Sequence, residues 1–307
     1  MSVTTDNKIT AAQYNTLQNR VARILGTGVD QTGYGQAPVS SPVVAETKVF
    51  AQKMVELVQD INAISIHQTG VATNLAVLNA SNKILADESA LDAKDGFNQF
   101  IFAVDQLEAN IGLVDGTQTT LETLASDTRF TSWNGKIIHS FTLTFDNADH
   151  RRAYFNAGGQ IWISSQIEGD VSAKGNDWRQ MLQNMGVIKF GANTTSKTGA
   201  GGTILPPAPD GPIGNFTLTA SLQQIFNREG QQINYAENRY RIFAKETSTR
   251  SIQFQIEFED ADAGDPNFDE NIEGTIVSIV RLLRPTGNAV SVDAPSYSVQ
   301  SALEVGG

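Results

Sequence analysis

Residues 139–169, HSFTLTFDNADHRRAYFNAGGQIWISSQIEG, contain the pattern on which the fold prediction depends. Phe141, Leu143 and Phe145 alternate with polar residues at the start of this stretch. Successive side chains of a strand point to opposite faces of a sheet, so this alternation predicts a strand with one apolar face.

The pattern changes after Phe145. An aspartate or asparagine within 146–149 can cap a short helix over Ala148 to Ala157. The pair Gly158-Gly159 ends that helix, because glycine tolerates the left-handed backbone common at helix ends. A second strand is predicted over 161–167, with its isoleucines on one face. The order strand, short helix, strand contains no catalytic signature and predicts a scaffold.

Working toward the C-terminus, a helix is expected from Asn176 or Asp177 to Met185, followed by a long Gly/Pro-rich loop over 191–214. Pro285-Thr286-Gly287 is expected to form a turn. Strands are expected at 187–190, 215–220, 233–244, 251–258, 274–284 and 290–299. About seven strands with two small helices favour an antiparallel β-sandwich-like domain over residues 131–307.

The N-terminal 130 residues carry helical patterns. Thr10 can cap a helix that runs to Leu25, and Pro42 suits the first turn of a second helix over 43–66. A third apolar stripe begins at Phe100 and extends with Ile111 and Val114 toward Leu121. The spacing of three and four residues in these helices resembles heptads. We therefore predict an α+β fold, with a helical assembly or docking region (1–130) followed by the β-rich domain.

The apolar stripes need something to pack against, and two alternatives remain at this point. They can form a helical bundle within one chain, or they can pack around a symmetry axis, most simply in a homotrimer. In the second case the interface consists of Leu17, Val21, Ile24, Phe50, Met54, Leu57, Ile61, Ile64, Val104, Leu107 and Ile111.

Composition limits the function classes. The formal net charge is −11, from 22 basic and 33 acidic residues, which argues against a broad nucleic-acid-binding face. The pair Arg151-Arg152 is expected on a solvated helix face. There is no cysteine, which excludes disulfides and thiolate chemistry. An apolar signal core and an apolar run of about 20 residues are both lacking, so neither general export nor a membrane span is expected.

Several blocks of sequence resemble a C-terminal domain found in virion structural proteins of tailed bacteriophages, notably contractile-tailed phages of cyanobacteria. The matching blocks occur in the same order within 135–303. They are Tyr154–Ile161 (YFNAGGQI), Asp177–Leu182 (DWRQML), Met185-Gly186, Phe258–Pro266 (FEDADAGDP) and Asp269–Thr275 (DENIEGT). The run around Tyr14-Asn15 and Gly26 to Gln36 resembles the front half of the same proteins more weakly.

The resemblance implies a structural role in the virion, without indicating which part of it. We predict a component of the phage neck, collar or tail that forms a homotrimer, assembles in the host cytoplasm with other virion proteins and carries out no enzymatic reaction. A receptor- or glycan-binding fibre module is the alternative. The tryptophans Trp133, Trp162 and Trp178 are candidates for a sugar-binding platform, although core packing explains their positions better.

The acidic loop near residue 260 is the strongest candidate for an ion site. Calcium prefers clustered carboxylate oxygens, and the candidate ligands here are Asp260, Asp262, Asp265 and Asp269. The spacing does not match the helix-loop-helix calcium pattern, and a solvated hairpin loop is the alternative. Only three histidines are present, without an HExxH pattern, and no other cofactor is predicted.

Overall fold

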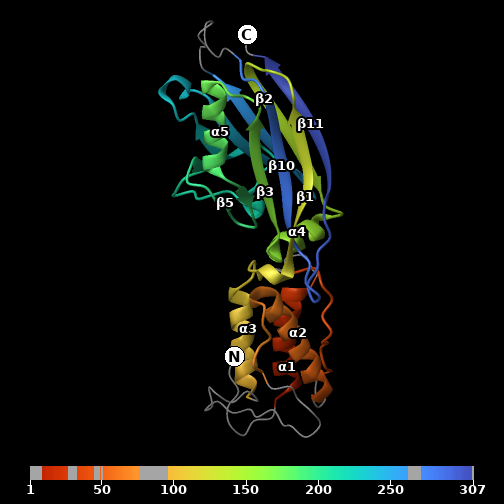
Figure 1. Ribbon diagram of the computed structural model, residues 1–307. Coiled ribbons are helices and arrows are strands. Elements are labelled where there is room, and N and C mark those ends of the chain that lie inside the picture. Colours follow the sequence, from red (N-terminus) through yellow and green to blue (C-terminus); the bar gives the residue numbers. More distant parts are fainter. Residues whose placement is uncertain are drawn as a thin grey trace. The chain divides into compact units, whose positions relative to one another are not determined.

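The computed structural model describes residues 9–26, 33–44, 49, 51–75, 96–261 and 271–305, with backbone alone from 302 to 305 (Figure 1). Two compact units make up the chain. The first comprises Met1–Thr120, Arg152–Gly158 and Arg284–Asp293, and the second comprises Leu121–Arg151, Gly159–Leu283 and Ala294–Gly307. The sequence-based division at residue 130 treats each part as continuous, whereas these units are interleaved along the chain.

The first helix is the one that the sequence predicts. Helix α1 (Ala11–Leu25) begins after Thr10, whose side chain accepts a hydrogen bond from the backbone N–H of Gln13 at 3.2 Å. The Gln13 side chain in turn accepts one from the Thr10 N–H at 2.9 Å. This reciprocal capping satisfies two donors that the first helical turn leaves open, so the predicted start is confirmed.

The other two helices of this unit are shorter than predicted. Helix α2 (Ala51–Thr69) begins eight residues after the predicted start at Val43, which is non-helical. Helix α3 (Phe97–Ala109) ends before Ile111 and Val114, and Leu121 lies on strand β1 (Thr119–Arg129). The heptad extrapolation was therefore wrong at both places, because apolar spacing alone does not include the contacts that end a helix.

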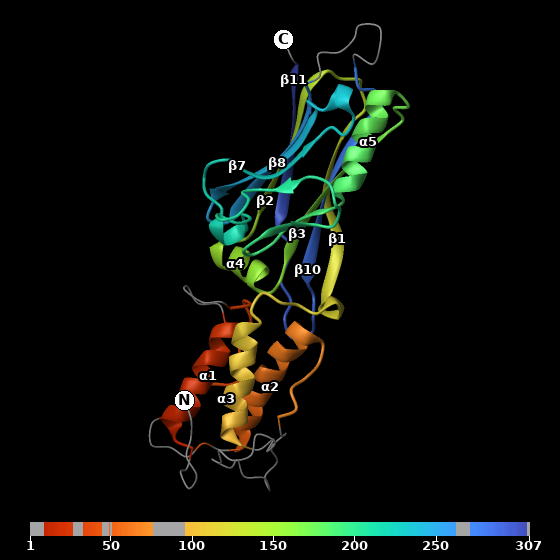
Figure 2. The same cartoon turned by 90° about the vertical axis from the view of Figure 1, so that its left-hand side faces the viewer.

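Helices α1, α2 and α3 pack against one another within one chain (Figures 1 and 2). Their inward side chains are almost fully buried. These are Tyr14, Leu17, Val21, Ile24, Met54, Leu57, Ile61, Ile64, Phe97, Phe100, Val104 and Leu107. In the structure these apolar stripes are thus buried within one chain, as the alternative of an intramolecular bundle expects.

The stretch 139–169 folds as predicted into strand β2 (Gly135–Thr144), helix α4 (Ala148–Asn156) and strand β3 (Gln160–Glu168). Phe141, Leu143 and Phe145 are fully buried. Gly158 has φ +86°, and a Cβ there would lie 2.6 Å from a side-chain carbon of Val114. Glycine is therefore required at this helix end for both backbone and space.

Two antiparallel sheets form the second unit. The five-stranded sheet has the order β1-β10-β3-β4-β5, and the six-stranded sheet has the order β11-β2-β9-β8-β7-β6. The remaining strands are β4 (Ile188–Phe190), β5 (Thr195–Lys197), β6 (Thr203–Ile204), β7 (Gln223–Glu229), β8 (Arg239–Ser248), β9 (Ser251–Asp260), β10 (Thr275–Pro285) and β11 (Ser296–Val305). The predicted α+β fold with a sandwich-like β domain is confirmed.

Several local predictions in this unit were wrong. The stretch 191–214 contains β5 and β6, and 215–220 begins with the 3-10 helix η2 (Asn215–Thr217) instead of a strand. The predicted strand 233–244 begins at Arg239, after the 3-10 helix η3 (Ile233–Tyr235), while β7 was missed. The last strand begins at Ser296, six residues later than expected.

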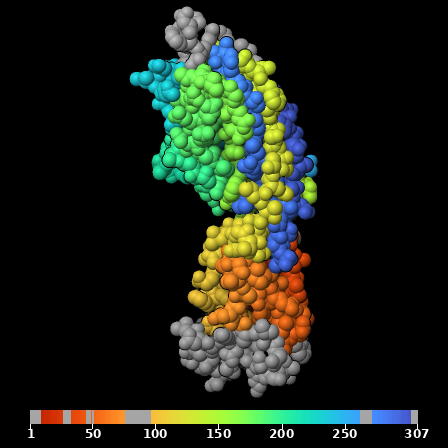
Figure 3. All heavy atoms as spheres, in the orientation of Figure 1, coloured from red at the N-terminus to blue at the C-terminus, as the bar shows by residue number. Residues whose placement is uncertain are grey.

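Helix α5 (Ala173–Met185) packs on β3 of this unit, and Figure 3 shows its surface in green. Its N-cap is Ser172, whose hydroxyl accepts from the Gly175 N–H at 2.9 Å, not the predicted Asn176 or Asp177. Its apolar face includes Trp178, whose ring meets that of Trp133 edge-on at 5.6 Å.

Among the helices of the described residues, none combines the length and apolar character that a membrane crossing requires.

Candidate functional site

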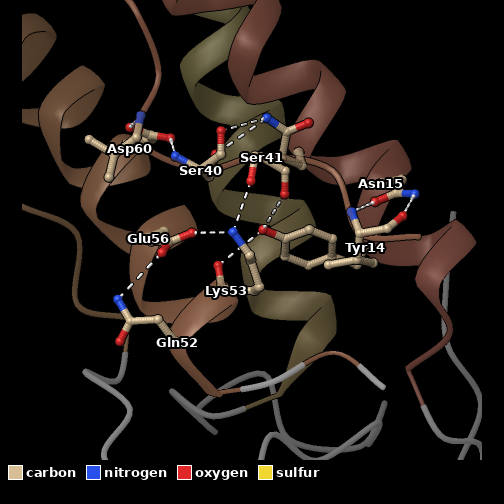
Figure 4. Close-up of polar contacts among 11 residues, drawn as sticks. Tyr14, Asn15, Ser40, Ser41, Gln52, Lys53, Glu56 and Asp60 are labelled. Carbon is tan, nitrogen blue, oxygen red and sulfur yellow. Dashed lines mark hydrogen bonds and ion pairs between the residues drawn. The ribbon is translucent and has the colours of Figure 1, made fainter. Parts of the chain in front are cut away.

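A polar cluster in the helical unit holds an extended segment, residues 39–43, which we call the strap (Figure 4). The buried Asp60 carboxylate of α2 accepts hydrogen bonds from the backbone N–H groups of Val39 at 2.9 Å and Ser40 at 2.8 Å. Gln18 of α1 donates to the Ser40 carbonyl at 3.2 Å. Side chains of both helices thus supply the partners that a strand or helix would normally give the strap backbone.

The end of the strap is fixed by α1. Asn15 accepts from the Val43 N–H and donates to the Val43 carbonyl, both at 2.8 Å. With both backbone groups engaged, Val43 is not available for a helical turn, which explains why α2 begins later. The single proton of the Tyr14 hydroxyl is shared between two carbonyls, that of Ser41 at 3.3 Å and that of Lys53 at 3.1 Å.

Charge surrounds the Tyr14 hydroxyl. Burial, followed by the negative charges of Glu56 and Asp60, raises the pKa of Tyr14 to about 12. Lys53 donates to the Ser41 hydroxyl at 2.8 Å and pairs with Glu56 at 2.9 Å. The phenol therefore stays protonated at neutral pH and acts as a donor, which is a positioning role.

The predicted interface residues are located mostly in the bundle core. Leu17, Val21, Ile24, Met54, Leu57, Ile61, Ile64, Val104 and Leu107 are all at most 4% exposed in one chain. They are not available to a partner while the bundle is closed. Ile111 follows α3 and is half-buried, whereas Phe50 lies outside the described residues. Self-assembly of the chain stays a prediction.

Of the predicted calcium ligands, only Asp260 lies within the described residues. Its Oδ2 atom is 3.0 Å from Nζ of Lys174 on α5, and both side chains are at most 1% exposed. Asp260 thus has a buried cationic partner from the protein itself. Asp262, Asp265 and Asp269 lie outside the described residues, within which no cluster of three candidate ligands occurs.

The DWRQML block supplies structural contacts at α5. The Asp177 carboxylate accepts from the backbone N–H groups of Gln231 at 3.1 Å and Gln232 at 2.9 Å, which anchors the turn after β7. Burial raises the pKa of Asp177, although these two hydrogen bonds oppose that effect. Trp178 is fully buried and lies 6.0 Å from the ring of Phe258, in the FEDADAGDP block.

Residues Tyr154–Gly158 of the YFNAGGQI block belong to the helical unit. Asn156 donates to the Gly33 carbonyl at 3.4 Å, and the Ala157 carbonyl lies 2.9 Å from Nε2 of His67 on α2. The His67 ring packs on Tyr34 with 4.9 Å between centroids. Burial lowers the pKa of His67 to about 4, and the hydrogen bond to Ala157 only partly offsets this effect. His67 is therefore neutral at physiological pH and donates to Ala157.

Arg151 is buried, so the predicted solvated face was wrong for this residue. Its guanidinium donates to Oδ1 of Asn215 at 2.7 Å and to Glu246 at 2.6 Å. It also donates to the carbonyls of Ser248 and Thr249 at 3.3 and 3.4 Å. One arginine thus joins α4 to η2 and to the turn between β8 and β9. The sequence gives no periodic signal for this role.

A histidine and a serine do meet in the β unit. His139 Nδ1 lies 2.9 Å from Oγ of Ser278, which lies 3.2 Å from Oγ of Ser165, and Ser165 is 3.0 Å from the hydroxyl of Tyr240. Burial lowers the pKa of His139 and raises that of Tyr240. His139 and Ser278 are at most 1% exposed. This chain of hydrogen bonds links the two sheets. Because the Ser278 hydroxyl is buried, a substrate cannot reach it.

The tryptophans do not form a shared platform. Trp133 is 3% exposed and Trp178 is fully buried, so both belong to the core. Trp162 is half-buried, and Lys189 lies over its ring at 4.1 Å. Core packing is thus the observed arrangement for two of the three.

Comparison of the chain with protein-family sequence profiles, with curated proteins and with solved structures finds no significant match.

Proposed function

We propose that this protein is a structural component of a tailed-phage virion, in the neck, collar or tail, and that it acts by protein–protein assembly without a chemical step. The resemblance in the blocks between 135 and 303 motivates this proposal. The chain would be made in the host cytoplasm and function in the particle, with no cofactor.

The observation that supports it most is how the described polar side chains of those blocks are used. Asp177 accepts hydrogen bonds from the backbone of a turn, Asn156 donates one to a loop carbonyl, and Asp260 forms an ion pair with a buried lysine. Outside those blocks, Asp60 and Arg151 bind backbone in the same way. These carboxylate, amide and guanidinium groups could in principle serve catalysis, but here they bind the backbone or a buried partner. That use fits a protein with a structural role.

The assembly that we propose is a homotrimer that docks onto other virion proteins. The heptad side chains are buried within one chain. The contacts between subunits of the trimer must therefore come from other residues. The exposed large apolar side chains among the described residues of the helical unit are the candidates: Val39, Val44, Val71, Phe102 and Leu113. Large exposed apolar side chains are typical of interaction sites when they cluster.

The test is incorporation into particles. Gradient-purified particles from a phage that encodes this chain are washed with 1 M salt, and the copies per particle are counted by quantitative mass spectrometry. We expect a fixed copy number that is a multiple of three and that survives the wash. Complete removal by the wash, or absence from infectious particles, would refute the virion role. Phe102→Ser tests the exposed candidates, with Thr16→Ala as a control on the same unit, since among the described residues the Thr16 hydroxyl bonds only to the Ala12 carbonyl of its own helix.

A further inference from the structure

A shallow pocket lies on the six-stranded sheet over β7 and β8, two neighbouring strands labelled in Figure 2. Its volume is about 270 Å³, which suits a ligand of one small ring rather than a drug-sized molecule. It is lined by Leu205, Gln224, Asn227, Glu229, Arg239 and Arg241.

The pocket follows from an irregularity in β7. The pairing of β7 with β8 shifts register between Gln224 and Phe226, and both Ile225 and Phe226 are fully buried. The backbone N–H of Leu205 donates to the Ile225 carbonyl at 3.0 Å, which sets Leu205 beside the irregularity. A bulge of this kind changes the direction of nearby side chains. As a result, Gln224 and Asn227 flank the pocket.

Arg241 is held in place before any ligand arrives. Its Nη2 atom lies 3.0 Å from Glu257 and 2.6 Å from Glu259, both on β9. The two carboxylates outweigh its charge and fix its orientation. Arg241 thus forms a fixed wall of the pocket, whereas its buried Nε atom is closed to a ligand.

Three further lining side chains have unused hydrogen-bonding capacity. Asn227 lies opposite Arg241 and Glu229 lies opposite Arg239 in the strand register. Within the part of the chain that the structure describes, the side chains of Asn227, Glu229 and Arg239 make no hydrogen bond or ion pair. The pocket therefore presents a carboxylate that only accepts, a guanidinium that only donates and an amide that does both.

The charges at this site do not favour an anion. Glu229 and Arg239 carry opposite charges, and Arg241 with Glu257 and Glu259 leaves one net negative charge. A net attraction for phosphate is therefore absent, and among the described lining residues only Leu205 has an apolar side chain. Hydroxyl groups both donate and accept, so a small neutral ligand with several hydroxyls matches this lining.

We propose that this pocket binds one neutral saccharide ring, with Asn227, Glu229 and Arg239 contacting its hydroxyls. The site does not involve the tryptophans. It adds a recognition function to the proposed assembly role and is independent of it, since it requires neither an oligomer nor a particle.

Ligand-observed saturation-transfer NMR of the full chain tests the proposal. The probes are glucose, galactose, mannose and N-acetylglucosamine, with inorganic phosphate and glycine as charged probes. We expect at least one sugar to bind, while phosphate and glycine do not. Asn227→Leu and Arg239→Leu should each weaken that sugar about tenfold, as expected for one lost hydrogen bond to a ligand.

Lys245→Leu is the matched control, because Lys245 lies on β8 two residues beyond Phe243 and does not line the pocket. It should leave sugar binding unchanged. Unchanged tryptophan fluorescence in each variant shows that the β unit is folded, since all three tryptophans belong to it. The proposal is overturned if no sugar binds, if phosphate or glycine binds instead, or if both pocket variants bind like the control.

Discussion

Replacing His67 tests whether the contact between α2 and the end of α4 stabilises the helical unit in a pH-dependent way. His67 is 1% exposed, and its pKa falls from 6.5 to about 4 in the folded chain because burial disfavours the charged ring. The unfolded chain therefore binds the proton more readily. Above pH 6.5 both states are neutral and nothing is lost. As the pH falls from 6.5 toward 4, stability is lost progressively.

The size of this effect follows from the two pKa values. Between pH 7 and pH 5, a histidine with pKa 6.5 unfolded and about 4 folded removes about 2 kcal/mol of stability. His67→Gln keeps a side-chain donor for the Ala157 carbonyl but cannot titrate. We expect the variant to lose about 2 kcal/mol less than the wild type over this pH range.

The assay is urea unfolding at pH 7 and pH 5, followed by ellipticity at 222 nm. Helices α1, α2 and α3 belong to the first unit, whereas all three tryptophans belong to the second, so ellipticity and fluorescence report mainly on different units. Thr69→Ala removes no titratable group and should keep the wild-type pH dependence. Equal pH dependence in the wild type and in His67→Gln would show that His67 does not cause the loss of stability.

Four further outcomes follow from the contacts. Asp60→Ala should destabilise the helical unit by about 3 kcal/mol, because two charge-assisted hydrogen bonds to the strap are lost, and faster amide exchange of the strap should accompany it. Arg151→Met should cost about 3 kcal/mol by urea unfolding, because it leaves a carboxylate and carbonyls without their cation, whereas Arg152→Met should cost less. Trp178→Ala should lower the free energy of unfolding by about 3–5 kcal/mol through the cavity that it leaves, read from the fluorescence transition. EDTA should leave the melting temperature unchanged, because Asp260 is already paired within the protein; a lower value would instead support the calcium hypothesis.

Local patterns were sufficient to predict much of the fold. The cap at Thr10 and the alternation in β2 and β9 depend on neighbours in sequence, and both were confirmed. Elements fixed by distant residues were not predicted correctly. Val43 is kept out of a helix by Asn15, which lies 28 residues earlier, and apolar spacing contains no signal for that contact.

The candidate site shows the same limit. The heptad pattern correctly marked buried side chains, but burial inside one chain and burial between chains leave the same pattern. Arg151 was expected in solvent because paired basic residues on helices usually lie there, and only its contacts with Asn215 and Glu246 show otherwise. Half of the described pocket residues, Gln224, Asn227 and Glu229, lie on β7. The sequence pattern does not reveal this strand, because its two apolar residues are adjacent and the rest of it is polar.

We propose that the chain works by assembling with copies of itself and with other virion proteins. The most direct solution measurement is the mass of the purified full chain by light scattering at two concentrations tenfold apart. One chain has a mass of 33.1 kDa. We expect about three times that mass at both concentrations. A mass of one chain at both concentrations would rule out the proposed self-assembly.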